Sequence, residues 1–124
     1  MMKTTQVKNA PSNGAGTKSL HCWSKAVQTE LLRLELADGS FFLFPYTQIM
    51  SARFEPRDSG DRLTLHLPNY DVQITGTNLR ELGLAFQKVS VEWVRVIPER
   101  YHPLADEEGV RVEQIEVKEI QHQQ

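Results

Sequence analysis

The residues with the strongest intrinsic chemistry in this chain are its single cysteine and its four histidines. His21 and Cys22 are adjacent, and a thiolate beside an imidazole is a ligand pair that zinc accepts. A structural zinc site needs four ligands, and His66, His102 and His122 supply no second pair at a suitable spacing. A catalytic cysteine needs a base positioned in space, which adjacency in the sequence does not provide. We therefore predict neither a metal site nor a cysteine nucleophile.

Residues 14–19 read Gly-Ala-Gly-Thr-Lys-Ser and partly resemble a phosphate-binding loop. That loop needs a glycine directly before its Lys-Ser pair and an apolar strand ahead of it, but Thr17 occupies the glycine position and no such strand precedes it. The sequence contains no nucleophile elbow and no zinc-binding helix motif. Five carboxylates fall on predicted outward faces or in turns, where hydration accounts for them: Glu35, Asp38, Asp58, Asp61 and Asp71. We expect no enzymatic activity and no cofactor.

Charge is distributed unevenly along the 124 residues, although the net charge is only −2. Residues 1–28 contain four lysines and no acid, whereas residues 104–124 contain six acids and two basic residues. Residues 1–20 have few apolar side chains to offset the entropy of ordering them, so we predict a flexible basic arm there. Such an arm can bind nucleic acid, but its lysines are sparse and solubility is the plainer interpretation. Residues 104–124 are predicted to be an acidic segment that could add one further strand.

No apolar run approaches the roughly 20 residues that a membrane span needs, and the N-terminus lacks the apolar core of a secretory signal. A single cysteine also excludes an internal disulfide. We therefore expect a cytoplasmic protein with no membrane partner.

Alternating apolar and polar residues predict β-strands from residue 29 onward. The first run ends at Asp38-Gly39, a pair typical of a two-residue hairpin turn in which both residues have positive φ, and residues 41–44 return antiparallel. Pro45 cannot donate to a ladder, so the returning strand must bend, bulge or lie at an edge there before it resumes at residues 49–54 as one long, curved strand. Further strands are predicted at residues 63–67, 70–74 and 91–96.

One helix is predicted at residues 79–88. Asn78 is a favourable N-cap and Glu81 is placed to complete a capping box. Gly83 permits a close approach to the sheet, beside an apolar stripe formed by Leu79, Leu82, Phe86 and Val89. Residues 21–103 are thus expected to form one α+β, mainly β domain. Its five or six antiparallel strands would make a small, strongly bent sheet or a partly closed barrel with one helix.

The strand–Asp-Gly–strand opening, the bent second strand and the run Val-Gln-Ile-Thr-Gly-Thr-Asn-Leu at residues 72–79 resemble the two signature motifs of the Sm-like family. The resemblance implies a small barrel that assembles into rings by strand pairing and binds RNA, with contacts at Gly76 and Asn78. The chain departs from the family in three ways. Thr75 replaces a basic residue that helps grip a uridine, residues 48–53 lack the Asp and Asn that hold the base, and a helix replaces a short turn. The resemblance therefore supports a barrel and a ring better than it supports RNA binding.

Some apolar residues exceed what one small domain can hide. Phe41 and Leu43 lie on the face of their strand opposite the predicted core, and Leu84 lies off the core stripe of the helix. Such surplus positions mark partner surfaces. The predicted protein interface consists of Leu43, Leu84, Val94 and Val96, with strand 91–96 as an edge that could pair with a neighbour.

Two functions remain open. The first is a non-catalytic interaction or assembly domain that forms a homo-oligomer. The alternative is an Sm-like RNA-binding barrel that places arginines on phosphates and aromatic rings on bases. Its contacts would be Arg53, Arg57, Arg62, Gly76 and Asn78. Residues 29–103 contain ten acids and eight basic residues, a balance that does not suit a phosphate-binding surface, so we favour the first.

Overall fold

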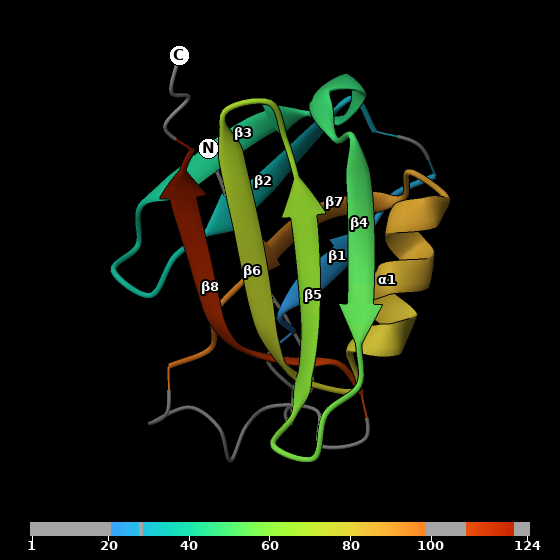
Figure 1. Cartoon of the computed structure of the whole chain (residues 1–124). Coiled ribbons are helices and arrows are strands. Elements are labelled where there is room, and N and C mark those ends of the chain that lie inside the picture. The colour runs from blue at the N-terminus through green and yellow to red at the C-terminus, as the bar shows by residue number, and fades with distance from the viewer. Residues whose placement is uncertain (1–20, 28, 99–108, 121–124) are drawn as a thin grey trace, which may run out of the picture.

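The computed structural model describes residues 21–27, 29–98 and 109–120, so the predicted flexible arm at residues 1–20 lies outside the described residues. The described part forms two four-stranded sheets that pack face to face, with one helix beside them (Figure 1). The first sheet has the strand order β1-β7-β2-β3 and the second has the order β4-β5-β6-β8. Their strands are β1 (Trp23–Lys25), β2 (Leu31–Glu35), β3 (Phe41–Pro45), β4 (Ser51–Glu55), β5 (Asp61–His66), β6 (Tyr70–Thr77), β7 (Val91–Arg95) and β8 (Arg111–Glu119).

The predicted class, α+β and mainly β with one helix, is confirmed. Neither sheet closes into a barrel, and the described residues contain more strands than expected. The additional strands are β1 and β4, since the predicted long strand is divided into β3 and β4, and β8 is the optional strand of the acidic segment. β8 pairs antiparallel with β6 from Arg111 to Glu119 and completes the second sheet.

The β2–β3 hairpin confirms the pairing but not the turn. The Leu36 N–H donates to the Ser40 carbonyl and the Gly39 N–H donates to the Leu36 carbonyl, which makes a three-residue loop. Only Gly39 has a positive φ, of 91°, as expected for a type I turn followed by a bulge. Asp38 instead accepts hydrogen bonds from the Ser40 hydroxyl (2.6 Å) and the Ser40 N–H (2.9 Å), which hold its pKa below the usual value.

The predicted long bent strand is two strands in different sheets. Pro45 ends β3, the Tyr46 N–H donates to the Glu30 carbonyl, and the chain then makes the 3-10 turn η1 (Tyr46–Gln48). β4 begins at Ser51 and pairs with β5 in the second sheet. Because a proline cannot donate to the ladder, the chain leaves the first sheet here instead of curving it closed. β3 and β4 thereby become edge strands of separate sheets.

The expectation that strand 91–96 lies at an edge is wrong. β7 is antiparallel to β1 on one side and parallel to β2 on the other. The segment before residue 26 forms β1 and covers the edge that the sequence left open. A surface for partners must therefore be sought elsewhere on the first sheet.

The helix α1 (Leu79–Gln87) lies where the sequence predicts it and Asn78 occupies the predicted N-cap position, but the predicted side-chain cap is wrong. Asn78 has a left-handed φ of 58° and makes no capping bond; its side-chain amide donates to the Gly109 carbonyl (3.1 Å). The Leu79 N–H donates instead to Asp61 Oδ2 (3.1 Å), so a carboxylate at the start of β5 stabilises the helix terminus. α1 lies beside β4 and buries Leu79, Leu82, Ala85 and Phe86 (Figure 1).

Candidate functional site

Chemistry-bearing groups do not cluster in the described part of the chain. No three His, Cys, Asp or Glu side chains there lie close enough together to hold a metal ion. Cys22 is buried, and its thiol donates a hydrogen bond to the Val110 carbonyl (3.0 Å). His66 Nδ1 and Asp71 Oδ1 lie 3.0 Å apart as an isolated pair. Within the same residues, no helix is both long and apolar enough to cross a membrane.

The feature that does stand out is the outer face of the first sheet, which we call the apolar face. Phe41, Leu43 and Leu31 are 55%, 54% and 48% exposed. They belong to the paired strands β2 and β3, where Leu43 lies opposite Arg33 and Phe41 lies opposite Glu35. The apolar face consists of Leu31, Arg33, Glu35, Phe41, Leu43, Trp93 and Arg95.

The alternation of β3 forces its apolar residues outward. Phe42 and Phe44 point into the core, where their rings stack with centroids 5.6 Å apart and both meet the ring of Tyr70. Because side chains alternate along a strand, Phe41 and Leu43 must face the opposite side. A sheet face that meets water normally carries polar residues at these positions. The sequence identified this surplus on β3, and the structure places it on an open surface.

Two arginines are fixed among these apolar side chains. The Arg33 guanidinium lies 5.9 Å from the ring centroids of both Phe41 and Trp93, and that of Arg95 lies 5.0 Å from Trp93. Arg33 Nε is also 3.0 Å from Glu35 Oε2. Cation–π contacts at exposed sites contribute about 0.5–1 kcal/mol each, enough to hold planar guanidinium groups against the rings. The apolar face is therefore an ordered surface with both charge signs.

Trp93 and Arg95 lie on this face because β7 contains a bulge, which the sequence does not predict. Ser24 pairs with Trp93 but Lys25 pairs with Val91, so Glu92 is an extra residue in β7. A bulge shifts the alternation by one residue. No local pattern announces it, because it depends on where β1 pairs.

The predicted interface residues are not gathered in one place. Of the four, only Leu43 lies on the apolar face. The placement of Val94 at an interface is wrong: its side chain is fully buried in the core, because the bulge turns both Val91 and Val94 inward. Val96 is half-buried and packs against the core. Leu84 is 47% exposed but lies on α1.

The predicted RNA contacts do not form a basic surface. On the outer face of the second sheet, Arg53 Nη2 lies 3.6 Å from Glu55 Oε2. Arg62 on β5 lies opposite Glu55 in the strand register. Arg57 Nε donates to the Gly60 carbonyl (3.4 Å) in the β4–β5 loop. Carboxylates thus accompany the basic groups on this sheet.

Gly76 is not available as a nucleic-acid contact, and its prediction as one is wrong. It is buried at an irregularity in the β6–β8 pairing, and a Cβ there would lie only 1.8 Å from the Arg111 carbonyl oxygen. The residue is glycine because β8 passes directly over it. Asn78 is exposed, but its side chain is bonded to Gly109.

Family models, curated proteins and solved structures provide no match to this chain. The Sm-like resemblance accordingly stays a prediction.

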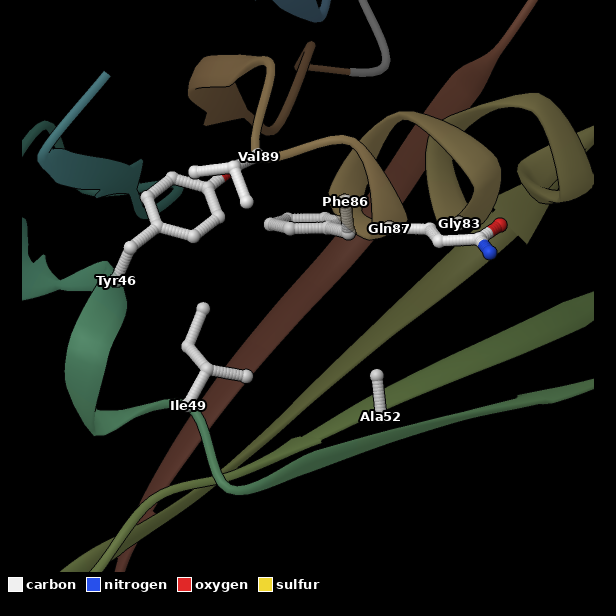
Figure 2. Close-up of a pocket in the computed structure, with 7 residues that line it drawn as sticks. All are labelled: Tyr46, Ile49, Ala52, Gly83, Phe86, Gln87 and Val89. Atoms are coloured by element: carbon white, nitrogen blue, oxygen red, sulfur yellow. The ribbon is translucent and has the colours of Figure 1, made fainter. Parts of the chain in front are cut away.

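A groove between β4 and α1 is the second feature of interest. Its larger pocket has a volume of about 310 Å³. Figure 2 shows the side chains of Tyr46, Ile49, Ala52 and Phe86 pointing into it from η1, the turn after η1, β4 and α1. The Tyr46 hydroxyl donates to the Val91 carbonyl (2.8 Å) and accepts from the Val91 N–H (3.1 Å), which ties η1 to β7. Burial raises the pKa of Tyr46 to about 12. A neighbouring pocket of about 160 Å³ shares Ala52 and Gly83, so the two form one groove.

Proposed function

We propose that this protein is a non-catalytic assembly domain that self-associates through its apolar face. One observation carries the proposal: three large apolar side chains, each about half exposed, lie together on an ordered sheet. Contiguous exposed apolar surface is characteristic of protein interaction sites. The arginines and rings held among these side chains are residue types enriched in interfaces.

A second copy of the chain fits this face better than a nucleic acid does. The face carries Arg33 and Arg95 together with Glu35, so its charges are mixed. In a two-fold interface the same patch meets itself, and an arginine of one protomer can approach the carboxylate of the other. A phosphate backbone would find Arg33 already held by two rings and Glu35, and Arg95 already held by Trp93 and the His21 carbonyl.

The expected dimer is weak and depends on concentration. Three strands of five residues and one of three, about 4.8 Å apart, span roughly 300 Å² in projection. Stable interfaces bury about 800 Å² on each partner, so this face alone supports only weak association that depends on concentration. Fully burying one such apolar side chain contributes about 1.5–3 kcal/mol, and these three are already half covered.

Sedimentation velocity of the full chain from 5 to 500 µM tests the proposal. The unmodified protein is expected to shift from monomer toward dimer, whereas Leu43→Lys should stay monomeric because it places a charge in the contact. Gln114→Lys is the matched control: it adds the same charge at an exposed position of β8 on the other sheet. Monomer at every concentration, or association of Leu43→Lys equal to that of Gln114→Lys, would contradict the proposal.

The RNA alternative has one specific observation in its favour, the arrangement of arginines over Phe41 and Trp93, since such rings can stack on bases. Anisotropy titration with a uridine 12-mer distinguishes it. We expect weak binding that disappears as salt rises from 50 to 200 mM. Binding that resists salt and is abolished by Phe41→Ala would replace the assembly proposal with the RNA one.

A further inference from the structure

We infer that the groove between β4 and α1 binds an extended peptide that carries a large apolar residue and a nearby carboxylate. The peptide would add to the second sheet as a further strand beside β4. This site is separate from the apolar face and does not depend on self-association.

The backbone of β4 provides the first half of such a site. β4 is the edge of the second sheet and pairs only with β5 within the described residues. Alternate N–H and C=O groups of an edge strand point outward and can pair with an incoming extended chain. α1 packs against β4 and β5 on the side that Ala52, Phe54 and Leu63 face, so an added strand would extend the sheet beyond β4 and point alternate side chains toward the groove (Figure 1).

Two pockets in the groove provide the side-chain specificity. The larger is lined by Tyr46, Ile49, Phe86 and Val89 and suits an aromatic or branched aliphatic side chain. The smaller lies farther along β4, between Ala52 and Phe54. Side chains two residues apart on a strand lie about 7 Å apart on one face. Alternate side chains of an added strand would therefore follow the pocket-lining side of β4, which carries Ala52 and Phe54.

Two residues in the groove wall are unfavourable for the fold itself. Gly83 lies inside α1, where alanine is the better helix former, and an added Cβ would meet only Leu63 Cδ1 at an ordinary 3.6 Å. The approach of the helix to the sheet therefore does not require glycine at this position. Val89 has a positive φ of 55° at a helix-ending position normally occupied by glycine. Locally unfavourable residues concentrate at functional sites.

The charge at the groove selects the partner. Arg80 lines the smaller pocket, is exposed, and forms no ion pair with any residue that the structure describes. Arg53, on the outer face of β4, already has Glu55. A carboxylate on the peptide, about two residues from its apolar anchor, would meet the Arg80 guanidinium.

The experiment selects ligands from a random 12-residue linear peptide library displayed on phage, using the full chain as target. Enriched sequences should pair an aromatic or aliphatic residue with Asp or Glu two positions away. Synthetic peptides of these sequences should bind with dissociation constants of about 10–100 µM by fluorescence anisotropy. N-methylation at alternate peptide residues should abolish binding, because it removes the strand hydrogen bonds.

Variants of the groove separate binding from folding. Val89→Gly and Gly83→Leu should each weaken the peptides at least tenfold without lowering the melting temperature. Arg80→Glu should lose them and accept peptides in which the acid is replaced by lysine, while Lys118→Glu, on β8, should behave as the unmodified protein. Leu43→Lys should bind the peptides normally, because Leu43 does not line the groove. Peptide binding can therefore be tested even if the protein does not self-associate.

Three results would overturn the inference: no enriched sequence, binding unchanged in both Val89→Gly and Gly83→Leu, or tolerance of N-methylation at every position. Enrichment of sequences found in this chain would assign the groove to a second copy instead of a separate partner.

Discussion

The outer faces of the two sheets are made by the same strand geometry but carry different residues. Both sheets have four strands and share one core. On the second sheet, polar groups alternate outward along every central strand, as in Arg62, Thr64 and His66 of β5 and Asp71, Gln73 and Thr75 of β6. On the first sheet, Phe41, Leu43 and Leu31 occupy the equivalent outward positions.

Packing of the shared core constrains the inward positions of each strand and leaves the outward positions free to vary. The second sheet satisfies the ordinary rule for an antiparallel sheet with one wet face. The first sheet departs from that rule at positions that its own core does not use, because Leu32, Leu34 and Phe44 already fill the interior. About half of each exposed apolar side chain there remains uncovered by the monomer. We interpret them as surface prepared for contact.

We expect the largest loss of stability in the second sheet, where the backbones of β6 and β8 approach closely at Gly76. Gly76→Ala should lower the free energy of unfolding by about 3 kcal/mol or more, because its Cβ would force β8 away from β6. Chemical denaturation measures the loss, and Thr75→Ala on the adjacent outward position is the control. A loss below about 1 kcal/mol would show that β8 moves easily and that the contact is not a constraint.

Tyr46→Phe acts where the two sheets are joined. It should lower the free energy of unfolding by about 1–3 kcal/mol, because the Val91 N–H and carbonyl lose their hydroxyl partner. The same denaturation experiment detects it, with Tyr70→Phe as the matched control.

The raised pKa of Tyr46 adds a pH signature to this prediction. The folded value is about 12, above the ordinary value near 10, so the folded state retains the proton longer than the unfolded state does. The stabilisation is present below pH 10 and is lost as the pH rises from 10 to 12. Allowing for the partial exposure of the ring, the loss should be about 1 kcal/mol. Equal slopes for the unmodified protein and Tyr46→Phe over this range would contradict the burial of the hydroxyl.

Phe41 lies on the apolar face of the first sheet, where we expect a substitution to change the free energy of unfolding least. Phe41→Ser should change the free energy of unfolding by less than about 1 kcal/mol, because half of the ring is exposed and its Arg33 contact is weak. Thermal unfolding at low protein concentration checks it. A loss of several kcal/mol would mean that the apolar face is part of the core, and the case for a contact surface would fail.

Local patterns in the sequence predicted most strands, the helix and the exposed position of Leu43. Each of these depends on a repeat of two or of 3.6 residues within one segment. The errors lie where distant segments meet. Asp61 stabilises the helix terminus that Asn78 was expected to cap, and the Glu92 bulge turns Val94 into the core instead of onto the predicted interface. The apolar face could therefore be predicted on β3 but not on β7.

Amide NMR spectra of the full chain, recorded at protein concentrations from 1 mM down to 20 µM, test the contact surface most directly. We predict that the amides of β2, β3 and β7 shift with concentration, while those of β5, β6 and β8 do not. Spectra independent of concentration, or shifts confined to the second sheet, would contradict assembly through the apolar face.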